Sequence, residues 1–273
     1  MKPTNLCYLL ILLSFGSCIS PRSYYMSPMD INSLPYHTLP NTTDSQRAAT
    51  YASLSIHAGG SNQTVKDGVS GMRGDIHRAY RFGNFQAYYG GGISLGNYHL
   101  HESDHTAYNY STMSDTTYHF PTSDKFFGSY GFGGGINLVI PFAGGRGEWR
   151  VIGFETSFQK EFGDYVKFRK QLRDSAYDIL ATYGQIFTVG GTTELVGISR
   201  HGTEIGYKVA LGSVLFPKGS YLGPESDFHP YYMSHTLHVT KRKVTGFMQF
   251  NIGAHALSLQ FGVNYNLSKK SGM

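Results

Sequence analysis

The sequence predicts an all-β fold: an antiparallel, up-and-down transmembrane β-barrel of eight to ten strands, with ten favoured. Three observations indicate this fold. Apolar residues alternate with small or polar ones along most of the chain after residue 47, as in strands whose two faces meet different surroundings. Short and long connections alternate between these segments. No run of 18 apolar residues follows residue 17, so the sequence predicts no transmembrane helix.

The first 18 residues have the order of an export signal. Lys2 supplies a positive charge, residues 6–15 (LCYLLILLSF) form an apolar core too short to span a bilayer, and two small residues precede Cys18. This order predicts a signal peptide over residues 1–17 that is removed. Residues 15–18 (FGSC) resemble the lipobox of bacterial lipoproteins. The resemblance implies that Cys18 becomes the first residue and carries lipid such as palmitate. The alternative is that Cys18 is only a small residue near an ordinary cleavage site.

The composition fits an exported chain that is held together without disulfides. Of the two cysteines, Cys7 lies in the predicted signal and Cys18 at its end, so the mature chain has no thiol pair. The chain contains 34 Gly, 21 Tyr and 18 Phe, only 15% charged residues, and a mean hydropathy of −0.26. Such a chain can still cross a membrane as a barrel. The net charge of +5 is too small and too dispersed to indicate nucleic-acid binding.

Residues 18–47 are predicted to be an extended tether between the lipid and the folded part. They contain four prolines among scattered Ser, Asn and Thr. This composition is typical of extended linkers. The barrel domain is then expected over residues 48–267, followed by a short C-terminal tail at 268–273.

The strand pattern is clearest at residues 257–267 (LSLQFGVNYNL), where six apolar residues share one face and five small or polar residues the other. Weaker alternation predicts further strands that begin near residues 51, 85, 129, 152 and 204. Glycines gather on the less apolar face, where a small closed barrel needs room and curvature. Alternation alone is also compatible with a soluble, lipocalin-like barrel whose apolar face points inward.

The connections favour the membrane barrel. Short connections that carry basic residues nearby are predicted to be periplasmic turns at 81–84, 144–147, 201–202 and 241–243. Long polar connections are predicted to be external loops at roughly 60–69, 99–125, 160–183 and 217–230. Counting 241–243 as a turn gives ten strands, whereas one strand over 237–252 gives nine, which is the wrong parity. Eight strands, with one pair merged, stay open as an alternative.

One external loop is predicted to contain a helix. Phe168, Leu172, Ala176 and Ile179 are spaced by four, four and three residues, with basic residues between them. This spacing predicts an amphipathic helix of about 14 residues that lies on the barrel. The alternative is an irregular loop.

The segment at residues 101–105 (HESDH) matches the H-E-x-x-H zinc pattern, in which Glu102 would activate water. The pattern requires a helix, but this segment follows a strand and lacks apolar periodicity. We therefore expect a solvated loop, in which His99, His101 and His105 are the candidates for opportunistic metal binding.

Two further motifs lack the structural setting that their chemistry needs. Residues 92–96 (GISLG) match the G-x-S-x-G nucleophile pattern, which requires a strand-to-helix turn rather than an alternating strand. Residues 131–135 (GFGGG) lack the lysine and the helix of a phosphate loop. His57, His77 and Ser94 could face one lumen, but spacing in the sequence does not show whether they lie within hydrogen-bond distance of one another. The sequence therefore predicts no catalytic residue and no cofactor.

As a whole, the sequence resembles small outer-membrane β-barrel proteins of Gram-negative bacteria that carry a lipoprotein signal. The resemblance covers residues 48–267 at the level of architecture only. It implies a bacterial outer-membrane location with an anchor at Cys18. Three functions stay open: a structural or interaction protein whose external loops meet protein or glycan partners, a membrane-embedded hydrolase with a site at the barrel mouth, and a narrow channel or ligand carrier. The first is favoured.

Overall fold

Strands make up most of the described chain in this computed structural model. The structure describes residues 24–41, 47–61, 67–109, 114–142, 144–172, 179–216, 219–221, 227–228, 230–253 and 256–268. Within these ranges, no helix is both long and apolar enough to cross a membrane.

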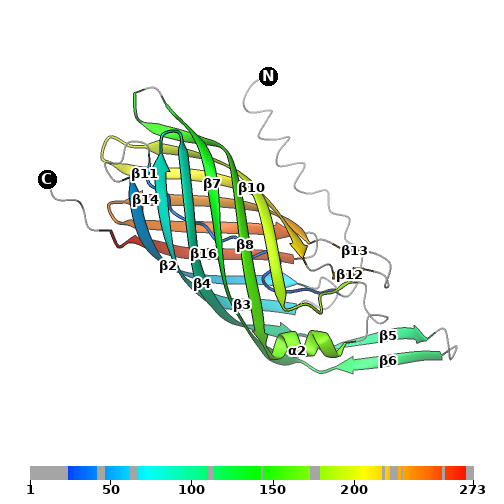
Figure 1. Ribbon diagram of the computed structural model, residues 1–273. Helices are drawn as coiled ribbons and strands as arrows, with labels where there is room; N and C mark the ends of the chain where they lie inside the picture. The colour runs from blue at the N-terminus through cyan, green and yellow to red at the C-terminus, as the bar shows by residue number, and fades with distance from the viewer. Residues whose placement is uncertain are drawn as a thin grey trace, which may run out of the picture.

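Ten of the described strands close into an antiparallel barrel (Figure 1). Successive barrel strands pair along the chain, and the last one returns to pair with the first. Because the barrel is closed, every barrel strand pairs on both sides, and no unpaired backbone edge faces the lipid. The barrel strands are β2 (Ala48–Ser61), β3 (Asp67–Phe82), β4 (Phe85–Leu100), β7 (Ser123–Pro141), β8 (Gly147–Gly163), β10 (Gln185–Ile198), β11 (Thr203–Phe216), β14 (Tyr231–Lys241), β15 (Val244–Gly253) and β16 (Ala256–Asn266).

The predicted fold class, the ten strands and the four predicted turns are confirmed. Two-residue to five-residue connections join β3 to β4, β7 to β8, β10 to β11 and β14 to β15 at one end of the barrel, which we call the turn end. Gly83 and Gly202 adopt positive φ angles of 58° and 71° in two of these turns, a conformation that glycine allows at little cost. The other connections lie at the opposite end, which we call the loop end; those from β4 to β7, from β8 to β10 and from β11 to β14 are longer, whereas β15 and β16 are joined by two residues.

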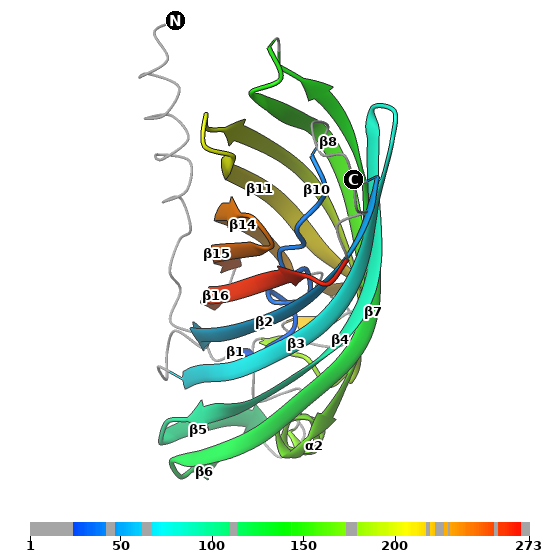
Figure 2. The ribbon, with the colours of Figure 1, turned by 90° about the vertical axis from the view of Figure 1, so that its left-hand side faces the viewer.

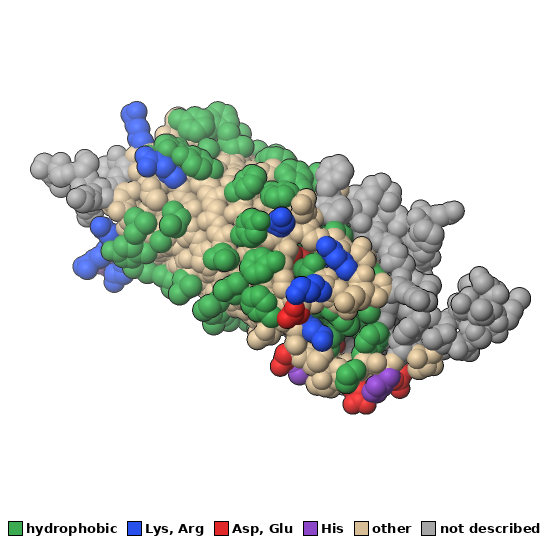
Figure 3. Space-filling view, turned by 60° about the horizontal axis from the view of Figure 1, so that its bottom comes forward, with side chains coloured by type: hydrophobic (Ala, Val, Ile, Leu, Met, Phe, Trp, Pro, Cys, Tyr) green, Lys and Arg blue, Asp and Glu red, His purple; other side chains and the backbone are tan. Residues whose placement is uncertain are grey.

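The outward face of the wall is apolar and the inward face is polar. On β2, Leu54 and Ile56 are 60% and 58% exposed, whereas Ser53, Ser55 and His57 between and beside them are buried. Figure 3 shows apolar side chains along the wall, with Lys and Arg side chains toward both of its ends. This arrangement is that of a transmembrane barrel of the outer-membrane type, and it contradicts the lipocalin-like alternative.

The loss of stability caused by a charge on the outward apolar face is expected to depend on its depth in the membrane. Leu54 lies midway along β2, so Leu54→Arg is expected to destabilise the barrel in lipid vesicles by about 2–4 kcal/mol. Leu267, equally outward but at the turn end, is the matched control, and Leu267→Arg is expected to cost about 0–1 kcal/mol. Denaturant titration of both variants measures the difference. Equal costs at the two depths would contradict a lipid-facing wall.

Smaller elements gather at the loop end (Figure 1). A hairpin of β5 (Ser103–Asn109) and β6 (Ser114–Phe120) projects from the barrel. The other elements there are helix α2 (Asp164–Gln171) and a four-stranded sheet made of β1 (Tyr24–Tyr25), β9 (Ile179–Leu180), β12 (Gly219–Tyr221) and β13 (Asp227–Phe228).

A helix is present in this loop, but it begins before the predicted one and ends at Gln171. Phe168 lies on α2, Leu172 follows it with an extended backbone (φ −71°, ψ 146°), and Ile179 lies in strand β9. Ala176 lies outside the described residues. The expected apolar stripe is therefore divided between a helix and a strand.

Residues 24–41, which we call the plug, lie inside the barrel rather than extending from it as the tether prediction expects. Figure 2 shows this segment running through the lumen. Met29 and Tyr36 are 0% and 2% exposed, and polar plug residues such as Asp30 are buried as well. The tether prediction is wrong for these residues because the lumen is polar, and a proline-rich polar segment fits it as well as it fits water.

Glycines on the inner face of the wall leave the space that the plug occupies. A Cβ atom at Gly190 would come within 2.9 Å of Leu34 Cδ1, and one at Gly253 within 2.7 Å of Ile31 Cγ2. Larger residues at these positions would force the plug to move. These two inward glycines therefore make room for the plug.

Candidate functional site

The plug begins at the loop end, where it joins the small sheet that lies there. Strand β1 pairs in parallel with β9, and Ala181 N donates to Tyr25 O over 3.0 Å. Tyr25 is fully buried and its ring meets Phe168 of α2 edge to face. The chain therefore passes under α2 as it enters the lumen.

A buried ion pair holds the first part of the plug. Arg169 of α2 donates to Glu161 of β8 over 2.6 Å, and both side chains are fully buried. Ser27 Oγ donates to the other oxygen of the Glu161 carboxylate, also over 2.6 Å. One carboxylate thus joins the wall, the helix and the plug.

Two tyrosines of the loop end also hold the plug. Tyr165 of α2 donates to Met26 O over 3.0 Å, and Tyr183 OH lies 3.0 Å from both carboxylate oxygens of Asp30. Burial raises the pKa of Tyr165 and of Tyr183 well above the usual value, so both phenols keep their protons. Both can therefore act as donors to the plug at any physiological pH.

In the middle of the lumen, wall side chains bind the plug backbone. Gln159 of β8 donates to Ser33 O over 2.8 Å, and Gln249 of β15 donates to Leu34 O over 3.1 Å. Asn32 Oδ1 accepts from Ser258 Oγ of β16 over 2.6 Å. Strands on different sides of the barrel therefore satisfy buried polar groups of the plug, among them two backbone carbonyls.

At the turn end, Arg150 of β8 holds the plug and two carboxylates at once. Its Nε donates to Glu148 over 2.9 Å and its Nη1 to Glu194 of β10 over 2.8 Å. Its Nη2 donates to Asn41 Oδ1 over 3.2 Å. His238 Nε2 lies 2.7 Å from the second Glu194 oxygen, so the network spans three wall strands and the plug.

These contacts fix the direction of the plug. Its first residues contact the loop end, and its last residues, Pro40 and Asn41, accept hydrogen bonds from Gln86 and Arg81 at the turn end. Strand β2 then begins at the turn end, where Ala48 pairs with Tyr80. The chain therefore enters the barrel from the loop end and turns back into the wall.

The H-E-x-x-H segment is not helical, as expected. His101 and Glu102 lie between β4 and β5, and His105 lies in strand β5 opposite Tyr118. His99 Nδ1 lies 2.7 Å from Asp124 on the surface, and its ring is 5.5 Å from that of His101. A helical zinc site of the protease type is excluded here, whereas loose metal binding by the three histidines stays a prediction.

Of the other sequence candidates, Ser94, His57 and His77 lie in the part of the chain that the structure describes. Ser94 lies inside strand β4, is buried and donates to Met72 O over 3.2 Å, so it is not on a nucleophile elbow. His57 and His77 face the same lumen but meet different neighbours: the ring of His57 lies 6.3 Å from Phe127, whereas that of His77 stacks on Tyr51. Cys18 lies outside the described residues, and its acylation stays a prediction.

Sequence reasoning missed the charged groups that hold the plug. Their signal was present, because Glu148, Arg150, Glu155 and Glu161 lie on the same strand as lipid-facing aromatic residues. A charge on such a strand must point into the lumen, where it needs a partner. Which partner it meets depends on strand order and on the plug.

The projecting hairpin carries an exposed histidine–aspartate pair whose hydrogen bond can be tested by titration. His119 Nδ1 lies 2.7 Å from Asp104 Oδ1, and this hydrogen bond raises the pKa of His119 above its usual value. Asp104→Asn is expected to lower the pKa of His119 towards about 6.5. Titration followed by imidazole NMR signals measures the change, and an unchanged midpoint would contradict the pairing.

Comparisons with solved structures find outer-membrane β-barrel proteins at low similarity. No known protein family and no curated protein matches the sequence. Among solved structures, the translocator domain of the autotransporter NalP from Neisseria meningitidis is 9% identical, with 82% of this chain and 90% of that chain covered and a TM-score of 0.39. The β domain of the Bordetella autotransporter BrkA (10% identity, 81% and 100% covered, TM-score 0.40) and the COG4313 outer-membrane channel of Pseudomonas putida F1 (8%, 85% and 100%, 0.37) are similar in the same way. No functional conclusion follows from likenesses at this level.

Proposed function

We propose that this chain is a lipoprotein of the bacterial outer membrane whose barrel is closed by its own N-terminal segment, and whose loop end binds a protein or glycan outside the cell. The observation that supports this proposal most is the plug. It lies along the lumen from one end to the other and is bound at both ends by buried charged groups. A lumen filled in this way favours an interaction protein over an open channel.

The direction of the plug also bears on where a lipid at Cys18 would lie. Cys18 precedes Tyr24 by six residues, which can span at most about 20 Å when fully extended. Tyr24 belongs to the sheet at the loop end. The apolar belt of such barrels is about 25 Å tall, so a six-residue segment from Tyr24 is too short to cross it. Since long loops face outward in outer-membrane barrels, an acyl chain on Cys18 is expected on the outer side of the membrane.

The loop end has the chemistry of a polar recognition surface. The β5–β6 hairpin projects beyond the barrel, and exposed histidine–carboxylate pairs, such as His99 with Asp124, lie near its base and along it. On the neighbouring helix, Lys167 pairs with Asp164 over 3.0 Å. Exposed basic and acidic side chains that can donate and accept hydrogen bonds suit a polar partner such as a glycan or a hydrophilic protein surface.

The experiment combines lipid labelling with accessibility on intact cells. Labelled palmitate is expected to enter the wild-type chain but not Cys18→Ala. An epitope inserted between Cys18 and Tyr24 is expected to bind antibody on intact cells. Matched controls carry the same epitope in the 110–113 loop, which should also react, and in the 143–146 turn, which should react only after the outer membrane is opened.

The outcomes separate the parts of this proposal. An epitope before Tyr24 that reacts only after permeabilisation would contradict the outward anchor. Label that persists in Cys18→Ala would contradict acylation at this residue. Ion conductance by the full chain in planar bilayers would favour the alternative of a narrow channel.

A further inference from the structure

We propose that His37, Asp75 and His77 form a binding site for one divalent transition-metal ion such as zinc, and that this ion fastens the plug to the barrel wall. His37 belongs to the plug, whereas Asp75 and His77 occupy neighbouring inward positions of β3. Two imidazoles and one carboxylate are a ligand set that zinc accepts readily. This inference does not depend on the proposed lipid anchor or on a partner at the loop end.

The spacing of the three side chains suits a metal better than hydrogen bonds. Asp75 Oδ1 lies 3.6 Å from His37 Nε2 and 3.6 Å from His77 Nδ1. Both distances exceed the usual hydrogen-bond range. Ligands bound tetrahedrally at zinc distances lie about 3.4 Å from one another, so small shifts would close the shell.

Two of the three atoms that would bind the ion make no hydrogen bond in the part of the chain that the structure describes. Asp75 Oδ1 and His77 Nδ1 are buried and make no hydrogen bond with the described residues. His77 Nε2 lies 3.0 Å from the carbonyl oxygen of Thr38. A carbonyl only accepts, so Nε2 carries a proton, and in the neutral ring the lone pair of Nδ1 points to the carboxylate. A cation between the two acceptors would satisfy both.

The hydrogen bond from His77 to Thr38 also matches the usual support of a metal ligand. A metal-binding imidazole commonly donates its second nitrogen to a backbone carbonyl, which fixes the ring and its tautomer. Here that carbonyl belongs to the plug, next to His37 itself. Wall and plug therefore orient the same site.

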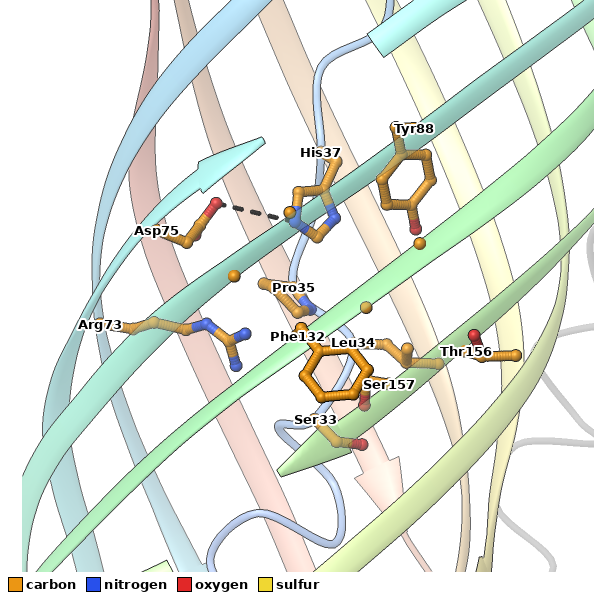
Figure 4. Close-up of a pocket in the computed structure, with 14 residues that line it drawn as sticks. Ser33, Leu34, Pro35, His37, Arg73, Asp75, Tyr88, Phe132, Thr156 and Ser157 are labelled. Carbon is orange, nitrogen blue, oxygen red and sulfur yellow. Dashed lines mark ion pairs between the residues drawn. The ribbon is translucent and has the colours of Figure 1, made fainter. Parts of the chain in front are cut away.

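Beside two of the three ligands there is a small cavity that could hold a fourth ligand, such as a water molecule. His37 and Asp75 line a cavity of about 10 Å³, together with Tyr88 and Arg73 (Figure 4). This volume is near the lower limit for one water molecule. Figure 4 shows the His37 ring facing the Asp75 carboxylate across this space.

The charge of the lumen favours a cation despite the nearby Arg73. Arg73 donates to Asn32 O over 3.3 Å rather than to the Asp75 carboxylate, among the contacts of the described residues. Among the described residues, the charged side chains inside the barrel are more often acidic than basic, with Asp30, Asp67, Asp75, Glu148, Glu155, Glu161 and Glu194 against Arg73, Arg150, Arg169 and Lys208. A divalent ion would offset part of this excess.

The test is zinc binding by the refolded full chain. After chelation and dialysis against zinc, the wild-type protein is expected to retain about one ion per chain, measured by plasma mass spectrometry. Cobalt in its place should give the intense visible absorption of a tetrahedral site. His37→Ala and His77→Ala are expected to lose both signals. His57→Ala removes another buried lumen histidine outside the cluster and should keep them, as should the loop variant H99A/H101A.

Folding of each variant is checked by the heat-dependent shift of the barrel band on gels. Hydrogen exchange on the wild type alone gives a second readout, since zinc should slow exchange of the plug amides around His37. A folded wild type that retains no zinc would overturn the proposal. So would zinc that survives His37→Ala and His77→Ala, or that is lost in H99A/H101A, because the ion would then lie at the loop end.

Discussion

Arg150→Met is expected to destabilise the barrel by about 3–5 kcal/mol. Arg150 is 2% exposed and lies between Glu148 and Glu194, which are themselves buried. Methionine keeps much of the volume but leaves two carboxylates in the lumen without their cation, and breaking a buried ion pair on one side costs this much. Trp149, the only tryptophan of the chain, lies next to the mutated residue and reports unfolding by fluorescence.

The control for this variant is Arg200→Met, because Arg200 is exposed in a turn at the same end. Its effect is expected within about 0.5 kcal/mol. Adding Glu148→Gln and Glu194→Gln to Arg150→Met should recover much of the lost stability, since the unpaired charges are then gone. Full stability of Arg150→Met alone would show that the two carboxylates do not need this cation.

Replacing residues 24–41 by a glycine–serine segment of equal length is expected to open the barrel to ions. The wall keeps its ten strands, but the side chains and backbone groups that fill the lumen are lost. Barrels of about eight strands are filled by their own side chains, so a ten-stranded wall leaves space that this plug occupies. Planar-bilayer recordings should show discrete steps for the variant and none for the wild type.

A conservative change in the plug separates loss of filling from loss of folding. Leu39→Ala removes one side chain and leaves the backbone contacts of the plug, so recordings should stay silent. A replaced variant that still shifts on heating but conducts no ions would contradict the plug as the seal. In that case, the inward side chains of the wall would themselves close the lumen.

The strands could be predicted because lipid imposes a simple rule on every one of them. Residues such as Leu54 and Phe261 must face outward, and the polar residues between them must face inward, so period two is visible in the sequence. The turns could be predicted for the same reason, since Gly202 and its neighbours interrupt that period. The helix was predicted too long, because the spacing of Leu172 and Ile179 resembles a helix although a separate strand contains Ile179.

The candidate site could not be predicted in the same way. The plug is polar and proline-rich, and this composition is equally compatible with water and with a polar lumen. His37 lies 38 residues before Asp75, and Arg150 precedes Glu194 by 44 residues, so no local pattern joins them. Of the histidines that the sequence singles out for metal binding, His99 and His101 lie together only because they are neighbours in the chain. His77 could be placed in the lumen from the sequence, but its neighbours His37 and Asp75 were not identified as partners.

The sequence by itself therefore determined the wall: its strands, their two faces and the turns. Local alternation is sufficient for this, because each strand has one face in contact with lipid and one face toward the lumen, whichever strands lie beside it. Only the tertiary structure decided what the wall encloses and which way the chain enters it. Contacts in the lumen join residues from strands on opposite sides and from the plug, such as Gln159 with Ser33 and Asn264 with Thr38. Closure of the barrel creates these pairs, so no single segment contains them.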